Sequence, residues 1–361
     1  MIMKEKTTYC CENCFTDKIL KQQIKFHGVK GSCDFCGAIR VCAYPIVPDK
    51  QQLQDELRGI IDLYEPAADE GVPLTEALIE DWDFVSHDLQ SHLGELLHAL
   101  YPQPDNLMAA VLSGNVKSKD FGELAILGGH SWSEFSEHVK RGNRYHIDYF
   151  QRKALDTFLS AVCVSVSPKE SLYRARICHN GSGFAPKDMG APPGLLARAG
   201  RINPAGISEL YLADSEDTAL HEVRAGMFDI VTFGRFQPQE QLTVADLSAF
   251  SRISPFADAI STESVAVNHE VLREMTAEMA KQMRSNDDPI EYVPTQFIAE
   301  YAKTVDGIDG VRNESTLVKG GDNYCFFNPN RLRCFEVRTT SIQGLSYVYK
   351  SQVKDPRQNT M

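Results

Sequence analysis

The chain has 361 residues, of which 43% are hydrophobic and 24% charged, and its formal net charge is −12. These values are typical of a globular protein of two or three domains and exclude a disordered chain. No apolar run is long enough for a transmembrane helix, and the first residues lack the apolar core of a signal peptide. Ten cysteines in a chain without a secretion signal indicate reduced thiols or metal, so we expect a cytoplasmic protein without a membrane partner. The negative charge argues against bulk attraction to nucleic acid, so no nucleic-acid partner is expected.

Half of the ten cysteines lie near the start of the sequence. Cys11-x-x-Cys14 and Cys33-x-x-Cys36 are separated by eighteen residues, a spacing within the range of paired zinc knuckles. Four thiolates would complete a closed tetrahedral Zn²⁺ site, which is structural because it leaves no position for a substrate. We therefore predict a small zinc module at 1–45. Free thiols are the alternative, and Cys10 could replace Cys11.

Residues 46–148 carry apolar side chains at helical spacing. Helices are predicted at 51–64, 74–79, 82–100 and 132–139, where leucines and aromatic residues recur every three or four positions. Prolines at 66, 102 and 104 interrupt the pattern. The sequence therefore predicts an all-helical domain here. The spacing of Arg141 and His146 formally fits an Arg-x4–6-His ribonuclease pattern, but Gly142 and Asn143 favour a turn and a linker.

The last part of the chain, 149–361, mixes strands and helices without regular alternation, which favours an α+β fold. Strands are predicted at 171–178, 210–213, 228–236, 309–316, 323–327 and 345–348, and helices at 149–162, 214–225, 267–283 and from Pro294 onward. In the first strand Arg174 and Arg176 share a face, so Arg176 could assist or replace Arg174. No GxGxxG or Walker pattern is present.

A glycine-bounded turn, Gly200–Gly206, precedes the strand at 210–213. It carries Arg201, whose planar charge can fork onto phosphate oxygens. Tyr211 offers a flat face for a ring, and Glu222 offers a carboxylate that could meet developing positive charge on a ribose. Each residue alone could be structural: a surface arginine, a core tyrosine and a solvated glutamate. Together the three residues suit a site that binds a dinucleotide.

This region resembles the RES-domain family. The matching residues, in the family's order, are Tyr173-Arg174, the Gly200-Arg201-x-Asn203-Pro204-x-Gly206 turn, Leu210-Tyr211-Leu212-Ala213, Ala219-x-x-Glu222 and Ser315. The resemblance covers about 170–350 and implies a fold similar to that of ADP-ribosyltransferases for 149–361. A weaker resemblance links the zinc and helical segments to the HEPN-like regions that precede some RES domains.

The resemblance implies an enzyme that consumes NAD⁺ by cleaving its nicotinamide–ribose bond, with water or phosphate as acceptor. The implied catalytic residues are Glu222, Arg174 and Ser315. Glu222 would stabilise the cationic transition state, because nicotinamide is already a good leaving group. Arg174 and Arg201 would hold the pyrophosphate, Tyr211 would stack on a ring, and Ser315 would bond the nicotinamide or its ribose. The amide of Asn323 would line the same pocket.

Other functions remain open at this point. The same pocket could transfer ADP-ribose to a protein, or the chain could be a zinc-ribbon regulatory protein whose RES-like domain is inactive. A HEPN-type ribonuclease that uses His146 is a further alternative. Since many related domains are toxins or defence effectors held in check by an antitoxin, we expect an antitoxin or regulatory protein as a partner. Related domains often form dimers, so we expect a homodimer.

Overall fold

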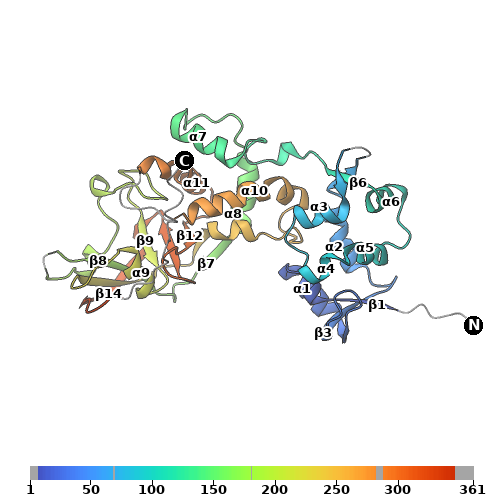
Figure 1. Cartoon of the computed structure of the whole chain (residues 1–361). Coiled ribbons are helices and arrows are strands. Elements are labelled where there is room, and N and C mark those ends of the chain that lie inside the picture. Colours follow the sequence, from blue (N-terminus) through green and yellow to red (C-terminus); the bar gives the residue numbers. More distant parts are fainter. Residues whose placement is uncertain (1–6, 68–69, 180, 282–287, 346–361) are drawn as a thin grey trace, which may run out of the picture. The chain divides into compact units, whose positions relative to one another are not determined.

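The computed structural model describes residues 7–67, 70–179, 181–281 and 288–345 and divides the chain into two compact units (Figure 1). The first unit is Met1–Val162 with Ala249–Ala277, and the second is Cys163–Ser248 with Glu278–Met361. Helix α8 (Arg152–Ala161) and most of α10 (Thr262–Met279) therefore group with the first unit, although the sequence-based boundary placed them in 149–361.

The first unit begins with a three-stranded antiparallel sheet in the order β1-β3-β2. The strands are β1 (Thr8–Cys11), β2 (Val29–Ser32) and β3 (Ile39–Ile46), and helix α1 (Lys18–His27) lies between β1 and β2 in the chain. The side chain of Asp17 accepts hydrogen bonds from the backbone N–H groups of Ile19 and Leu20 and so caps α1. Leu20 and Ile24 form the buried side of this helix.

Helices are the main regular structure of the middle segment, as its apolar spacing predicts. Its helices are α2 (Gln52–Ile61), α3 (Leu74–Glu80), α4 (His87–Gln90), α5 (Leu93–Leu100), α6 (Asn106–Ser113) and α7 (Trp132–Arg141). The helix predicted at 82–100 is thus two shorter helices. At the start of α7, Ser131 and Glu134 form a reciprocal capping box, which fixes where that helix begins.

The expectation of an all-helical segment at 46–148 is wrong in one respect. A second small antiparallel sheet, in the order β4-β6-β5, lies within it. Its strands are β4 (Tyr64–Pro66), β5 (Val72–Pro73) and β6 (Asn115–Ser118). Strands of two to four residues are too short to show the alternation by which a strand is recognised in sequence.

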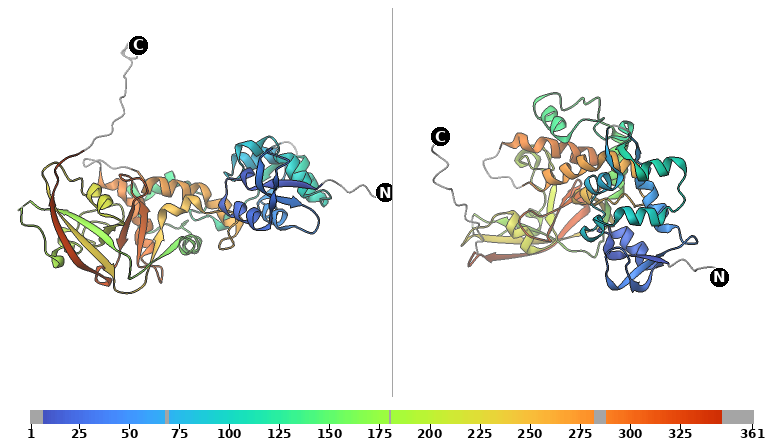
Figure 2. Two further views of the ribbon diagram at one scale, coloured as in Figure 1. Left: turned by 90° about the horizontal axis from the view of Figure 1, so that it is seen from below. Right: turned by 45° about the vertical axis from the view of Figure 1, so that its right-hand side comes forward.

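The second unit is built on a large sheet (Figure 2). Its eight strands are hydrogen-bonded in the order β14-β10-β8-β9-β13-β12-β11-β7. Its strands are β7 (Cys163–Val166), β8 (Leu172–Ile177), β9 (Leu210–Ala213), β10 (Ile230–Pro238), β11 (Leu242–Asp246), β12 (Gly310–Glu314), β13 (Asp322–Phe326) and β14 (Leu332–Ser341). All pairs are antiparallel except β11 with β12. With helices α9 (Glu216–Glu222) and α11 (Val293–Ala302), this sheet confirms the predicted mixed α+β class.

Two apolar clusters form the core of this sheet. The larger includes Leu172, Leu212 and Phe236, whereas the smaller includes Ala175 and Ala213. Strands β8 and β9 contribute to both, since neighbouring side chains of a strand point to opposite faces. The smaller cluster has three buried alanines and packs under α9, so this short helix lies close to the sheet.

The remaining strand prediction, at 345–348, falls almost entirely outside the described residues, and Leu345 itself is not in a strand. Within 7–67, 70–179, 181–281 and 288–345, no helix combines the length and the apolar character needed to cross a membrane.

Candidate active site

A pocket of about 370 Å³ lies in the second unit where β8 and β9 meet. These strands pair only at Tyr173 and Ala213, whereas β8 pairs with β10 over six residues. The weak junction leaves room between neighbouring strands. The pocket is lined by Tyr173, Arg174, Ala175, Arg201, Ile202, Tyr211, Leu212, Ala213, Ala219, Glu222, Val223, Asn313, Thr316, Asn323, Tyr324 and Cys325.

Glu222 is the last residue of α9, and its carboxylate lies in the pocket wall. The Ser215 side chain accepts a hydrogen bond from the N–H of Thr218 and so caps the start of this helix, which the sequence predicted at 214–225. Ser315 Oγ and Asn323 Nδ2 each donate a hydrogen bond of 2.8 Å to the same carboxylate oxygen, Oε1. Three residues that are up to 101 positions apart in sequence therefore meet at one carboxylate.

The neighbouring backbone orients the hydroxyl group of Ser315. Its Oγ accepts weak hydrogen bonds from the N–H groups of Leu317 and Val318, at 3.2 and 3.3 Å. Both acceptor positions of the hydroxyl are then used, so its O–H is oriented to donate a hydrogen bond to Glu222. The turn that follows packs on α9: a Cβ at Gly321 would lie 2.4 Å from Thr218 Oγ1, so a larger residue at this position would have to displace Thr218.

The Gly200–Gly206 turn is fixed by buried amide groups. Asn203 is 4% exposed, and its Nδ2 donates to the backbone carbonyls of Arg198, Pro204 and Ile207 at 3.0–3.1 Å. Its Oδ1 accepts a 2.6 Å bond from the hydroxyl of Tyr211. This arrangement holds Tyr211 at the edge of the pocket, where 37% of the residue is exposed. Burial of the hydroxyl raises the pKa of Tyr211 well above its ordinary value.

Helix α11 supports the same turn from the other side. Thr295 Oγ1 donates to the carbonyl of Arg201 at 2.8 Å, and Gln296 Nε2 donates to the carbonyl of Gly200 at 2.7 Å. Both side chains are buried. The roles of Asn203, Thr295 and Gln296 were not predicted from the sequence. Asn203 could have been found, because a polar residue inside a glycine-bounded turn commonly bonds nearby backbone.

Removing the Asn203 side chain should destabilise the protein measurably. We expect Asn203→Ala to lower the free energy of unfolding by about 1–3 kcal/mol, because it leaves buried carbonyls and the Tyr211 hydroxyl without partners. Denaturant unfolding monitored by circular dichroism measures this, because both tryptophans lie in the first unit and would not report on the second. Asn330→Ala, at an exposed position of the same unit, should change stability little. Equal stabilities for the two variants would contradict the role given to Asn203.

The two predicted phosphate-binding arginines line the pocket, but neither side chain is free. Arg174 Nη1 donates to the carbonyls of Met189 and Gly190, at 3.3 and 2.5 Å. Arg201 donates to the carbonyls of Met279 and Lys281 at the end of α10. Burial, together with the neighbouring Arg176, lowers the pKa of Arg174 to about 10, so it stays charged at neutral pH.

Arg176 does not line the pocket. Its guanidinium lies over the ring of Phe184, 4.1 Å from the centroid, and it donates to the carbonyl of Asp188. The structure therefore places Arg174, Arg201, Tyr211, Glu222 and Asn323 in one pocket, with Ser315 bonded to Glu222 at its edge. Cys325 also lines the pocket and is buried; burial raises the pKa of its thiol well above the ordinary value.

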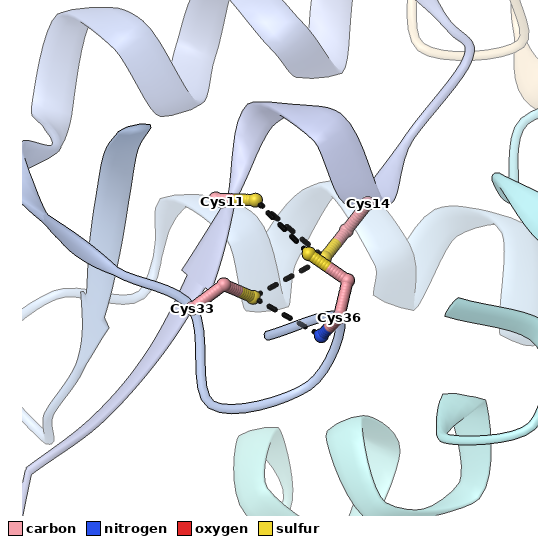
Figure 3. Close-up of side chains that lie close together, drawn as sticks. All are labelled: Cys11, Cys14, Cys33 and Cys36. Atoms are coloured by element: carbon pink, nitrogen blue, oxygen red, sulfur yellow. Dashed lines mark hydrogen bonds between the residues drawn. The ribbon is translucent and has the colours of Figure 1, made fainter. Parts of the chain in front are cut away.

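The four predicted metal ligands form a separate cluster in the first unit (Figure 3). The Sγ atoms of Cys11, Cys14, Cys33 and Cys36 all lie within 4.8 Å of one another. Individual pairs are 3.4–3.9 Å apart, and a regular tetrahedron with Zn–S bonds of about 2.3 Å places sulfurs about 3.8 Å apart. The four sulfurs therefore fit a zinc ion. Cys10 is buried beside Cys14 and Cys33 but is outside this set.

Comparison with known proteins identifies a domain family in the second half of the chain. Residues 171–349 match the model of the RES domain family. The matched range contains the whole pocket, from Tyr173 to Cys325. The chain matches no curated protein and no solved structure. The chain therefore carries a RES domain, preceded by a region whose four-cysteine cluster is compatible with a zinc module. A RES domain is consistent with an enzyme that acts on NAD⁺.

Proposed function

We propose that the RES domain cleaves the nicotinamide–ribose bond of NAD⁺ and that Glu222 stabilises the transition state. One observation carries this proposal: Ser315 and Asn323 both hold Oε1 of Glu222. Among the described residues, no hydrogen bond reaches the second carboxylate oxygen, Oε2. The carboxylate is thus oriented by one oxygen and can face a substrate with the other.

Cleavage of the nicotinamide–ribose bond requires an oriented carboxylate and does not require a general acid. When the C1′–N bond breaks, its electron pair goes to the pyridinium nitrogen, and nicotinamide leaves as a neutral molecule. The ribose ring then carries positive charge, which a nearby carboxylate stabilises as it does in glycosidases. An oxygen of water or phosphate forms the new bond to C1′, and the proton that it loses goes to solvent.

The cationic side chains of the pocket support a substrate with a pyrophosphate group. Within the described residues, neither Arg174 nor Arg201 forms an ion pair with a carboxylate, and both donate to backbone carbonyls. Their positive charges are therefore not neutralised at short range. Two arginines beside an oriented carboxylate suit a ligand whose negative phosphates and developing positive ribose are adjacent.

Replacing Arg201 tests this part of the proposal. Arg201→Ala should weaken NAD⁺ binding by about 1.5–3 kcal/mol, the range for a hydrogen bond to a charged group, and should affect KM more than kcat. Steady-state kinetics of nicotinamide release measure both constants. Arg333→Ala, at an exposed position on β14, serves as the matched control. An unchanged KM in Arg201→Ala would show that the guanidinium does not contact substrate.

Product analysis distinguishes the possible acceptors. Free ADP-ribose would show hydrolysis, a phosphorylated ADP-ribose formed only with phosphate would show phosphorolysis, and labelled protein would show ADP-ribosyl transfer. We propose a fold related to ADP-ribosyltransferases for this domain, and a toxin- or defence-like role, because depletion of NAD⁺ would stop growth. Expression of the wild-type chain and of Glu222→Gln in the same host tests that role: only the wild type should lower cellular NAD⁺.

A further inference from the structure

A second chamber of about 300 Å³ adjoins the candidate active site. It is lined by Arg174, Pro192, Ala197, Arg198, Gly200, Asn203, Ile207, Glu209 and Tyr211. Arg174 and Tyr211 line both cavities. Each cavity has the volume of a small-ligand site, and an elongated ligand that passed Arg174 would occupy both.

Glu209 has an unsatisfied carboxylate oxygen. The residue is 2% exposed, and Oε1 accepts a 2.6 Å bond from Lys303 Nζ. Oε2 is also buried, yet it has no hydrogen-bond partner within the described residues. Burial raises the pKa of this carboxyl even though Lys303 opposes the change. A buried carboxylate oxygen without a donor is costly, so a ligand that supplied one would bind favourably.

The rest of the chamber combines apolar and cationic surface. Pro192, Ala197 and Ile207 supply apolar contacts. Arg198 is exposed and, within the described part of the chain, forms no ion pair. An apolar wall beside an unpaired cation and a carboxylate acceptor suits a nucleoside attached to phosphate: the base packs on the wall, and its hydroxyl or amino groups donate hydrogen bonds.

We propose that this chamber binds the adenosine half of NAD⁺, while the nicotinamide riboside half lies against Glu222 in the first pocket. Arg174, which lines both cavities, then contacts the pyrophosphate between the two halves. Glu209 Oε2 accepts a hydrogen bond from the adenosine. This inference rests on the proposed function, because it assigns a site to the half of NAD⁺ that the first pocket does not hold.

Binding to the slow variant Glu222→Gln separates this inference from catalysis. Calorimetric titration should show that NAD⁺ binds at least about tenfold more tightly than nicotinamide mononucleotide, which lacks the adenosine half. Ile207→Trp in the same background fills the chamber without removing a buried charge. It should weaken NAD⁺ binding by about tenfold or more and leave the mononucleotide unchanged. Glu209→Gln should also reduce the preference for NAD⁺ over the mononucleotide. Glu240→Gln, at an exposed position, should leave that preference unchanged.

The outcomes distinguish the two claims. Equal affinities for NAD⁺ and the mononucleotide, or loss of both in Ile207→Trp, would overturn the second chamber as an adenosine site while the proposed reaction still stood. Preferential binding of NAD⁺ by a wild-type protein that releases no nicotinamide would support the chamber and refute the reaction. No binding of either ligand would refute both.

Discussion

Replacing Glu222 with glutamine should lower the rate of nicotinamide release from NAD⁺ by at least about 100-fold, because it removes the charge that stabilises the ribosyl cation. Glutamine keeps the shape of the side chain and can still bond to Ser315 and Asn323, the two donors to Oε1. The loss should therefore appear in kcat, with little change in the affinity for NAD⁺. Nicotinamide release followed by liquid chromatography under saturating NAD⁺ gives the rate directly.

The matched control is Glu216→Gln. Glu216 is at the other end of α9 and pairs with Arg338 on the surface, outside the pocket. It has the same charge, and its variant should keep the wild-type rate within about twofold, since surface substitutions have small effects. A Glu222→Gln protein that is folded and retains the wild-type rate would show that Glu222 does not act at the reacting centre.

Loss of a single cysteine of the four-sulfur cluster should have the second large effect. We expect the wild-type chain to hold one zinc ion and Cys33→Ser to lose it, because a closed structural site requires all four thiolates. Metal binding and folding are coupled in such small modules. The variant should therefore also lose the order of the segment around β1, β2 and β3. Elemental analysis of the purified protein measures the zinc content, and proteolysis of the N-terminal segment measures its order.

Cys42→Ser provides the control in the same module. Cys42 lies on β3, outside the four-sulfur cluster, and its Sγ contacts the carbonyl of Ile24 instead. This variant should keep its zinc and its resistance to protease. Equal zinc contents in Cys33→Ser and Cys42→Ser would mean that the cluster is a group of free thiols.

Local patterns in the sequence predicted several elements of the fold. Helix α9, the strands that carry Arg174 and Tyr211, and the paired cysteines of the first unit all depend on residues close together in the chain. Such patterns depend only on short-range geometry, so they can be recognised in the sequence alone. The strands β4, β5 and β6 were not predicted, because two to four residues are too few to show an alternating pattern.

Interactions between distant segments could not be predicted in the same way. No spacing rule indicates that the Ser315 hydroxyl would donate a hydrogen bond to Glu222, because that contact depends on how the turn after β12 packs on α9. Likewise, the sequence suggested a guanidinium at Arg201 free for phosphate, whereas the backbone carbonyls at the end of α10 hold it. Both are tertiary contacts across 78 or more positions.

The most direct test of the proposed function is nicotinamide release from NAD⁺ by the purified, zinc-loaded chain, measured with and without phosphate. We predict release of nicotinamide, with the second product identifying water or phosphate as the acceptor. A folded protein that binds NAD⁺ but releases no nicotinamide, transfers no ADP-ribose to protein and behaves as Glu222→Gln does would contradict the assignment of this pocket as an NAD⁺-cleaving site.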